Sequence, residues 1–342
     1  MLRGWGSALP PALSQDELWD GFFAGHYSSS RVARRAWERS GVLTRHGVID
    51  PRVEDISTWS TGERMRRFLT EAMPLGKAAL TDTLDGAGLA PSEVDQLIVV
   101  SCTGYATPGL DHLLARDLGM RADTQRLHIG HMGCYAALPA VATAADAARV
   151  RDQRVAVLCA ELTSLHLQPA TDDVEQMVAH SLFADAATAV AVTPGGPGLE
   201  VVRVASRTDA NHADLMSWEV TDHGFRMRLS PRVPLVLREH VADCVDELLR
   251  SAGLGYDDVA GWAVHPGGPR IIDVVADRLG LEEEDVAPSR AVLAEHGNCS
   301  SATVLLILER LTRERDLGRG EHVVALAFGP GLTLYAALLR AS

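Results

Sequence analysis

The feature that most constrains this sequence is an internal similarity between its two halves. The segment 88–94 recurs as 253–259, an offset of 165 residues (94 to 259), and each copy leads into a short apolar run typical of a buried β-strand. Residues 133–134 lie opposite residues 298–299 at the same offset (133 to 298). Because these matches occur in the same order, we favour a duplicated unit over chance similarity between two stretches of strand and helix.

Short apolar runs alternate with stretches of helical periodicity, which is typical of an α/β protein. The predicted strands are 94–102, 125–129, 155–162, 187–192, 199–206, 259–265, 322–328 and 333–339. The predicted helices are 65–86, 110–118, 135–150, 235–252, 271–279 and 300–312. The densest turn cluster, 194–198, is the expected linker, so we divide the chain into halves 1–194 and 199–342.

Length and charge exclude several classes of protein. The chain has 342 residues, more than the roughly 250–300 at which one hydrophobic core stops growing. Its 45 acidic residues outnumber 32 basic ones, for a net charge of −13, which disfavours a general nucleic-acid binder. The stretch from Arg31 to Arg45 is an exception, with five arginines and one glutamate.

The cysteines and the apolar runs limit the cellular compartments in which the protein is expected to work. Five cysteines without a CxxC pair suit neither a zinc site nor a disulfide framework and favour a reducing cytoplasm. No apolar run approaches the ~20 residues of a membrane span, and the N-terminus lacks the apolar core of a secretory signal. The absence of GxxxxGK[ST] excludes a P-loop.

Cys134 is the first candidate for chemistry. It follows the predicted strand 125–129 and stands at the start of the predicted helix 135–150, where the helix dipole lowers the pKa of a thiol. Gly133 permits the sharp strand-to-helix turn that such a nucleophile needs. The alternative is a buried structural cysteine, as expected for Cys102, Cys159 and Cys299.

Two further polar side chains follow predicted elements of the second half. His265 ends a buried strand and precedes Pro266-Gly267-Gly268-Pro269, where it could serve as a base or pair with a thiolate, or simply cap the turn. Asn298 precedes the predicted helix 300–312, where it could cap the helix or direct its amide N–H toward a developing oxyanion. Gly329-Pro330-Gly331 could let backbone approach a ligand or form an ordinary turn.

Together these pieces resemble the type III polyketide synthases, the chalcone-synthase-like family of the thiolase superfamily. The resemblance runs from about Arg31 to the C-terminus. It rests on Gly133-Cys134, Cys159-Ala160-Glu161-Leu162-Thr163, Ser181-Leu182-Phe183-Ala184-Asp185, His265-Pro266-Gly267-Gly268-Pro269, Gly297-Asn298-Cys299-Ser300-Ser301-Ala302 and Phe328-Gly329-Pro330-Gly331-Leu332-Thr333. It implies a five-layered αβαβα thiolase fold of two pseudo-symmetric halves, which accounts for the internal similarity.

The resemblance also implies a mechanism and a set of site residues. Cys134 would accept an acyl starter from coenzyme A, His265 would keep its thiolate ionised, and His265 with Asn298 would stabilise the enolate formed when malonyl-CoA loses CO₂. The family further implies a cytoplasmic homodimer with no metal and no cofactor beyond its coenzyme A thioester substrates. Its other site residues would be the gatekeeper Phe183, the coenzyme A ligands Arg35 and Arg39, and the cavity residues Thr163, Gly329, Pro330 and Gly331.

Three positions depart from the plant members of the family. Met227 stands where plant enzymes have a second gatekeeper phenylalanine, Thr107 where they have a methionine that reaches into the partner subunit, and His166 where a threonine usually shapes the cavity. These changes disfavour an aromatic starter. Together with the run 163–169, they favour a bacterial-type enzyme that makes a pyrone or resorcinol from a fatty acyl starter.

Two other functions compete with this interpretation. A ketoacyl synthase III also uses Cys, His and Asn, but it makes a single condensation, and one expects an HQAN-like motif and a glycine where Pro330 stands. A non-catalytic thiolase-fold protein would only bind acyl chains. The presence of all three polar residues counts against it.

Overall fold

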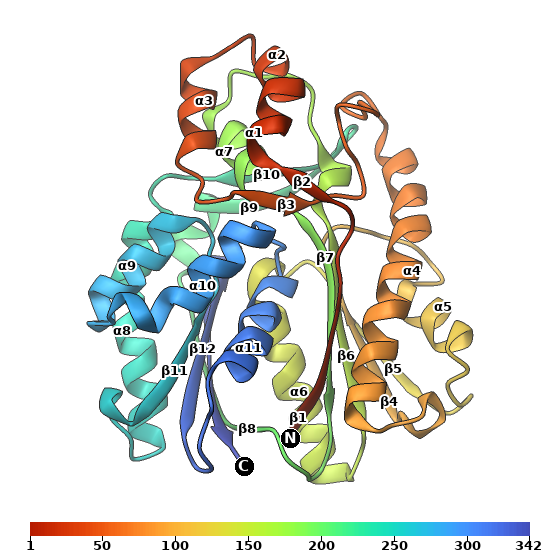
Figure 1. Cartoon of the computed structure of the whole chain (residues 1–342), viewed down its shortest axis with the longest axis vertical. Coiled ribbons are helices and arrows are strands. Elements are labelled where there is room, and N and C mark those ends of the chain that lie inside the picture. The colour runs from red at the N-terminus through yellow and green to blue at the C-terminus, as the bar shows by residue number, and fades with distance from the viewer.

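The computed structural model covers residues 1–342 and confirms the α/β prediction, with two sheets that meet edge to edge (Figure 1). The nine strands run in the order β11-β12-β13-β8-β1-β7-β6-β4-β5. The N-terminal half supplies β1 (Leu2–Ala8), β4 (Gln96–Val100), β5 (Gln125–Ile129), β6 (Val155–Leu162) and β7 (Asp185–Val192). The C-terminal half supplies β8 (Leu199–Thr208), β11 (Val259–Val264), β12 (His322–Gly329) and β13 (Thr333–Ala341). Only the pair Leu2–Leu199 joins the two groups.

Helices fill three layers around these sheets, so that the five layers of the thiolase fold follow one another across Figure 1. The outer layer on the N-terminal side holds α4 (Thr61–Ala87) and α5 (Leu110–Asp117). The layer between the sheets holds α6 (Ala137–Arg151) and α11 (Ala302–Glu314). The outer layer on the C-terminal side holds α8 (Val233–Ser251), α9 (Pro269–Leu279) and α10 (Glu283–His296).

The middle layer gives the two halves a common core. One cluster of 38 buried side chains includes alanines of α6, such as Ala140 and Ala144, and larger residues of α11, such as Leu305 and Leu308. Small side chains on α6 let this helix lie close to its neighbours, and the leucines of α11 fill the remaining space. The starts of α6 and α11, where residues 134 and 298 lie, are thereby held near the same end of the sheets.

A smaller lobe lies above the sheets in Figure 1. It consists of α1 (Gln15–Leu18), a π-helical turn (Trp19–Phe23), α2 (Ala24–His26), α3 (Arg31–Glu38) and α7 (Val174–Leu182). It also contains the hairpins β2 (Ala12–Ser14) with β3 (Thr44–His46) and β9 (Met216–Thr221) with β10 (Gly224–Leu229). The sequence patterns missed this lobe, because its strands are short and its polar helices carry little apolar periodicity.

The predicted elements of the sheets are confirmed, two of them (β5 and β6) in both bounds. The pattern missed β1, whose seven residues carry two glycines and pair with β7. The two halves are not identical, because β5 has no full counterpart in the second half. Close to the place in the second half that lies 165 residues after β5, the chain forms only one isolated β-bridge, between Asn298 and Phe183.

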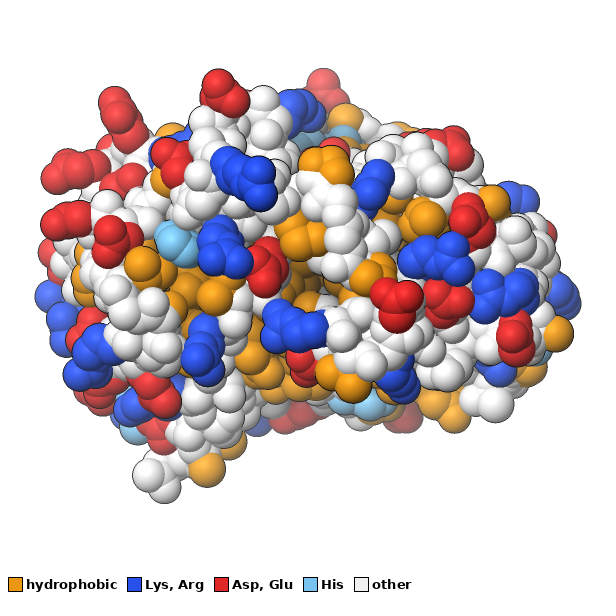
Figure 2. Space-filling model, turned by 90° about the horizontal axis from the view of Figure 1, so that it is seen from below, with side chains coloured by type: hydrophobic (Ala, Val, Ile, Leu, Met, Phe, Trp, Pro, Cys, Tyr) orange, Lys and Arg blue, Asp and Glu red, His pale blue; other side chains and the backbone are white.

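The charges are dispersed on the face seen in Figure 2, which views the molecule from below. Acidic and basic side chains alternate over most of this face, acidic ones gather at its left edge, and hydrophobic ones lie in the recesses between them. This face carries no basic stripe of the kind that binds nucleic acid. None of the helices has both the length and the apolar character that crossing a bilayer requires.

Candidate active site

Cys134 lies in a tight turn between β5 and α6. The turn is a 3₁₀-helix, Gly133–Tyr135, and the thiol is 5 % exposed. Gly133 has φ +77°, and a Cβ atom there would lie 2.6 Å from the Cδ of Pro330. Gly329 likewise packs against the turn, where a Cβ would lie 3.3 Å from the backbone nitrogen of Cys134. Two glycines and Pro330 thus hold the backbone around the thiol.

His265 follows the carboxyl end of β11 and is almost fully buried. Its backbone N–H donates to the carbonyl of Leu326, 2.8 Å away, which fixes the main chain next to β12. Neither ring nitrogen has a hydrogen-bond partner in the protein. Because a buried polar group without a partner is costly, this imidazole is available to a ligand in the cavity that it lines.

Asn298 precedes α11 and is also buried. Its side-chain oxygen accepts a hydrogen bond from the backbone N–H of Ser300, 2.9 Å away, so the amide NH₂ group has no protein acceptor and is free to donate. Its backbone is tied to the segment that carries Phe183, through bonds to Leu182 and Ala184 at 2.9 and 3.0 Å. The oxygen of this asparagine thus makes a capping-type contact at the start of the helical turn, while its NH₂ group is left for a ligand.

A tunnel of about 570 Å³ brings these three side chains together. Cys134, His265 and Asn298 all line it, although they come from three different parts of the chain. Arg35, Arg39 and Arg270 line it as well, and all three are exposed. The sequence pointed to Arg35 and Arg39 but not to Arg270, whose position beside the turn 266–269 gave no signal.

Arg45, at the end of the arginine-rich stretch, does not belong to this tunnel. It is buried, and its guanidinium donates to Gln15 and to the carbonyls of His180 and Phe183. Burial lowers the pKa of this guanidinium to about 9. Its role is to hold the backbone of the gatekeeper segment.

An inner cavity of about 260 Å³ lies beyond Cys134. Among the predicted cavity residues, Thr163, Phe183, Met227, Pro330 and Gly331 line it. The sequence indicated Cys102 as a core residue, but it lines this cavity, and so does His131. Ser300 and Trp218 line it too and were missed, because a residue's position in a cavity leaves no trace in periodicity.

Three predicted cavity positions lie elsewhere. Gly329 lines neither cavity and instead lies behind Cys134, as described above. Thr107 is exposed, in a surface loop where its hydroxyl donates to the phenol of Tyr105, 3.2 Å away. Thr107 thus lines none of the cavities of its own chain, and its proposed contribution to the partner subunit stays a prediction. His166 does not line the inner cavity but lines a smaller chamber beside it.

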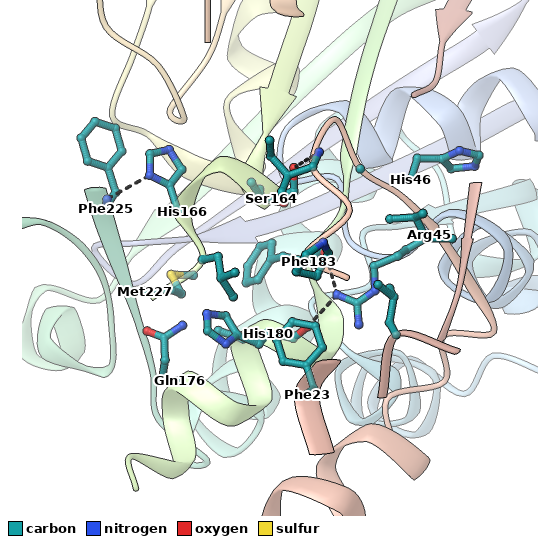
Figure 3. Close-up of a pocket in the computed structure, with 18 of the residues that line it drawn as sticks. Phe23, Arg45, His46, Ser164, His166, Gln176, His180, Phe183, Phe225 and Met227 are labelled. Atoms are coloured by element: carbon teal, nitrogen blue, oxygen red, sulfur yellow. Dashed lines mark hydrogen bonds between the residues drawn. The ribbon is translucent and has the colours of Figure 1, made fainter. Parts of the chain in front are cut away.

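A side chamber of about 70 Å³ continues behind Phe183 and Met227 (Figure 3). Both side chains line the tunnel, the inner cavity and this chamber, so they stand at the junction of all three spaces. Phe23, Gln176 and His180 form the far side of the chamber in Figure 3. This position at the junction is compatible with the gatekeeper role predicted for Phe183.

His166, Trp218 and Phe225 form an aromatic wall. Nδ1 of His166 accepts from the backbone N–H of Phe225 at 3.0 Å, so its Nε2 carries the proton and donates to the carbonyl of Thr103 at 2.7 Å. The rings of His166 and Phe225 stack at 4.5 Å, and Trp218 meets His166 edge-on at 5.4 Å. Burial lowers the pKa of His166 to about 3, so this imidazole is a neutral structural group.

Glu161 is a buried carboxylate beneath the inner cavity. It accepts hydrogen bonds from the backbone N–H of Cys102 at 3.0 Å, the hydroxyl of Thr103 at 2.8 Å and the hydroxyl of Ser301 at 2.5 Å. Burial raises the pKa of this carboxyl. The network fixes two walls of the cavity against each other. No three His, Cys, Asp or Glu side chains are grouped so that they could hold a metal ion.

Burial opposes charge on both Cys134 and His265. It raises the pKa of the Cys134 thiol to about 12 and lowers the pKa of the His265 imidazole to about 3. The expectation that the helix start lowers the thiol pKa is therefore wrong for the buried side chain, because desolvation outweighs the backbone and the hydroxyl of Ser300. A thiolate here needs a nearby cation.

A thiolase fold in which a cysteine, a histidine and an asparagine line one deep tunnel is that of a condensing acyltransferase. The models for the N- and C-terminal domains of chalcone and stilbene synthases match residues 7–196 and 201–342. The chain belongs to the chalcone and stilbene synthase family, and thus to the type III polyketide synthases, as the sequence motifs indicated.

Curated relatives cover nearly the whole chain. A 3,5-dihydroxyphenylacetyl-CoA synthase of Streptomyces toyocaensis is 34% identical, over 98% of this chain and 89% of the relative. A 1,3,6,8-tetrahydroxynaphthalene synthase of Streptomyces peucetius subsp. caesius is 34% identical, over 90% and 83%. The alpha-pyrone synthesis polyketide synthase-like Pks18 of Mycobacterium tuberculosis is 32% identical, over 88% and 80%.

Solved structures agree with this assignment. The crystal structure of 1,3,6,8-tetrahydroxynaphthalene synthase from Streptomyces coelicolor A3(2), a bacterial type III polyketide synthase, superimposes with a TM-score of 0.94 at 29% identity. The match covers 100% of this chain and 99% of that one. The fold prediction, including the thiolase architecture, is therefore confirmed.

Proposed function

We propose that Cys134 is the nucleophile that accepts an acyl starter from its coenzyme A thioester. Its sulfur attacks the acyl carbonyl, the bond to the coenzyme A sulfur breaks, and the coenzyme leaves as the thiol. The supporting observation is that Cys134 lies where the tunnel and the inner cavity meet, since it lines both. A chain attached to this sulfur can extend inward while coenzyme A occupies the tunnel and meets Arg35 and Arg39 with its phosphates.

His265 and Asn298 are the groups proposed to stabilise the extender enolate. When malonyl-CoA loses CO₂, the electron pair of the broken C–C bond remains as an enolate on the thioester. The free amide NH₂ of Asn298 and a ring N–H of His265 can donate to its oxygen. The enolate carbon then attacks the Cys134 thioester, and the released thiolate accepts the chain again for the next extension.

The inner cavity favours a small substrate and a compact product. Its 260 Å³ lies below the usual range of about 300–1,000 Å³ for drug-sized ligands, and the aromatic wall closes it. We therefore favour a short acyl starter extended by a few malonyl units and cyclised to a pyrone or a resorcinol. Met227 lies between this cavity and the side chamber. Because the methionine side chain is flexible, a longer starter would gain room at this junction.

The observation that carries the proposal is the meeting of a cysteine, an unpartnered imidazole and a free amide on one tunnel. Purified protein incubated with malonyl-CoA and a length series of acyl-CoAs should give pyrone or resorcinol masses. A single 3-ketoacyl product would instead indicate a ketoacyl synthase. Cys134→Ala should abolish both starter loading and product, whereas product formation by this variant would refute the nucleophile.

Asn298→Asp separates the two half-reactions. We expect decarboxylation of malonyl-CoA to fall about 100-fold or more, because an acceptor replaces the donor to the enolate. Starter loading on Cys134, followed by mass spectrometry of the acyl-enzyme, should change much less. An equal loss of both activities would remove the role that we assign to Asn298.

The remaining parts of the proposal concern the setting of the enzyme. We propose that it works as a homodimer in the cytoplasm and needs no cofactor beyond thioester substrates. Two features favour the dimer. The strand β5 is an edge of the sheet, with no partner strand on its outer side. The loop that contains Thr107 and Tyr105 lies on the surface, where Tyr105 is 65% exposed.

A further inference from the structure

The mouth of the tunnel carries a set of arginines that have no partner within the protein. Arg35, Arg39 and Arg270 line the mouth, and Arg31 and Arg232 stand next to its lining residues Val32 and Val233. All five are exposed. None has a carboxylate within 4.0 Å or donates a side-chain hydrogen bond, whereas neighbouring Arg34 is paired with Glu38 at 2.8 Å.

These arginines come from both halves of the chain, and three of them, Arg35, Arg39 and Arg270, line the same tunnel. The end of α3 lies against the start of α9, since a Cβ on Gly41 would lie 3.6 Å from the ring of Pro269. In Figure 1 α3 stands above α9 and α10 on the same side of the molecule. Glu175 is the only acidic residue that lines the tunnel, and the backbone N–H of Leu229 already donates to it.

Exposed aliphatic side chains accompany the arginines. Val32 and Val174 line the mouth and are 51% and 50% exposed, and Leu235, beside the lining residue Pro234, is 58% exposed. The mouth therefore combines positive charge with apolar surface, on a chain whose net charge is −13. Such a combination is typical of a surface that binds an acidic macromolecule transiently.

We propose that this rim, consisting of Arg31, Arg35, Arg39, Arg232 and Arg270 with Val32, Val174 and Leu235, is the docking surface for an acidic acyl carrier protein. The carrier would deliver the starter as a thioester on its phosphopantetheine arm, which the tunnel admits as far as Cys134. This inference rests on the proposed function, because it names a second source of the starter for the same cysteine.

The charge and position of the rim residues, taken together, fit a carrier protein better than they fit coenzyme A. Arg35 and Arg39 lie within the mouth and are one turn apart on α3, where they can meet the phosphates of coenzyme A. Arg31, Arg232 and Leu235 do not line the tunnel, so a small ligand threaded through it leaves them uncovered. An acidic protein that carries the same arm would contact all of them.

The transfer step needs no additional reagent. The sulfur of Cys134 attacks the acyl carbonyl, the bond from that carbonyl to the arm's sulfur breaks, and His265 passes the proton of the cysteine to the departing thiol. The electron count is that of a thioester exchange, and the products are the acyl-enzyme and the free carrier thiol. The extension steps that follow are unchanged.

The test compares two donors of one acyl group. The probes are hexanoyl-CoA and a stand-alone acidic carrier protein of bacterial fatty-acid synthesis charged with hexanoate, and the readout is the rate of acyl-Cys134 formation by mass spectrometry. We expect the carrier to load the wild type and the double variant Arg31→Glu/Arg232→Glu to load from it about tenfold more slowly or worse. Loading from hexanoyl-CoA should change less than twofold, because neither residue lines the tunnel.

A matched control is Arg319→Glu, a charge reversal at an exposed, unpaired arginine near the amino end of β12, at the other end of the strands from His265. It should leave both loading rates unchanged. Loading from hexanoyl-CoA but not from the carrier would overturn the docking proposal, and so would an equal loss with both donors in the double variant. Failure of the wild type to load from either donor would instead refute the proposed function.

Discussion

At the scale of single residues, the site depends on how a buried thiol becomes a nucleophile. Burial raises the pKa of Cys134 to about 12, and the unpartnered imidazole of His265 is a buried basic side chain of the same tunnel, whereas the arginines that line it are exposed. A proton moved from the thiol to the imidazole would create two opposite charges that stabilise each other. Without that imidazole, desolvation alone would set the thiol pKa.

His265→Gln should therefore move the thiolate to higher pH. A raised pKa means that the thiolate form appears only as the pH rises, so alkylation by iodoacetamide at pH 7 should fall about tenfold for each unit of the shift. The pH profile of inactivation measures the shift directly. His131→Gln, which changes a histidine of the inner cavity, is the control and should leave the profile in place. An unchanged profile in His265→Gln would disprove the pairing.

Trp218 is the residue that should limit the length of the product. Its ring lines the inner cavity, and its Nε1 donates to the carbonyl of Cys102 at 2.7 Å, which fixes the ring as part of the wall. Trp218→Ala should open the cavity and shift the product spectrum by at least one added malonyl-derived unit, as seen by mass spectrometry. Val220→Ala, at a residue of the same strand that is 72% exposed and does not line the cavity, is the control. The same product spectrum in both variants would show that the wall does not limit length.

At the scale of elements, the first turn of α4 positions that wall. Arg64 is fully buried and donates to four backbone carbonyls, those of Trp59, Leu165, Ile56 and Ser57. Leu165 precedes His166, so this guanidinium ties the helix to the turn that carries the wall. Arg64→Met leaves these acceptors without a donor.

We expect Arg64→Met to lower the free energy of unfolding by about 3 kcal/mol, because each unsatisfied buried carbonyl costs on the order of 1 kcal/mol or more. Urea denaturation measures the change. Arg66→Met removes an exposed, unpaired arginine from the same helix and should stay within about 0.5 kcal/mol of the wild type. A similar small effect of both substitutions would mean that water replaces the guanidinium.

The elements that the sequence predicted well are those with a strong apolar pattern. The strands β5 and β6 and the helix α5 follow from buried runs and turn residues, and the collinear offset indicated two similar halves. Cys134, His265 and Asn298 stood out because each follows or precedes such an element. The aromatic wall did not, because His166 and Trp218 are 52 residues apart (166 to 218) and meet only through tertiary packing.

At the scale of the whole molecule, the two halves share one buried middle layer, and a shared core explains why the site can be divided between them. Cys134 comes from the first half, and His265 and Asn298 come from the second. The backbone bonds between Asn298 and the Phe183 segment cross from one half to the other. Movement of one half against the other would open the site, so the packing of α6 against α11 supports catalysis as well as stability.

The outer edge of β5 is where a second copy of the chain should bind. Gln125 and Ile129 bond to the side of β4, through Asp95 and Ser101, so the alternate residues Arg126 and His128 direct their backbone groups outward. An exposed strand edge of this kind is a template for pairing with another chain. A twofold pairing of β5 with its copy would join the sheets of two molecules.

Arg126→Pro tests this interface because proline removes one outward N–H and leaves β4 paired. We expect the wild type to sediment as a dimer at micromolar concentration and Arg126→Pro to sediment as a monomer with a native circular dichroism spectrum. Arg126→Ala removes the ion pair with Asp111, 3.0 Å long, but keeps the N–H, so it should remain dimeric. A monomeric wild type would contradict the proposed dimer, and a dimer that survives the proline would place the contact elsewhere, because the proline removes an N–H that pairing at this edge needs.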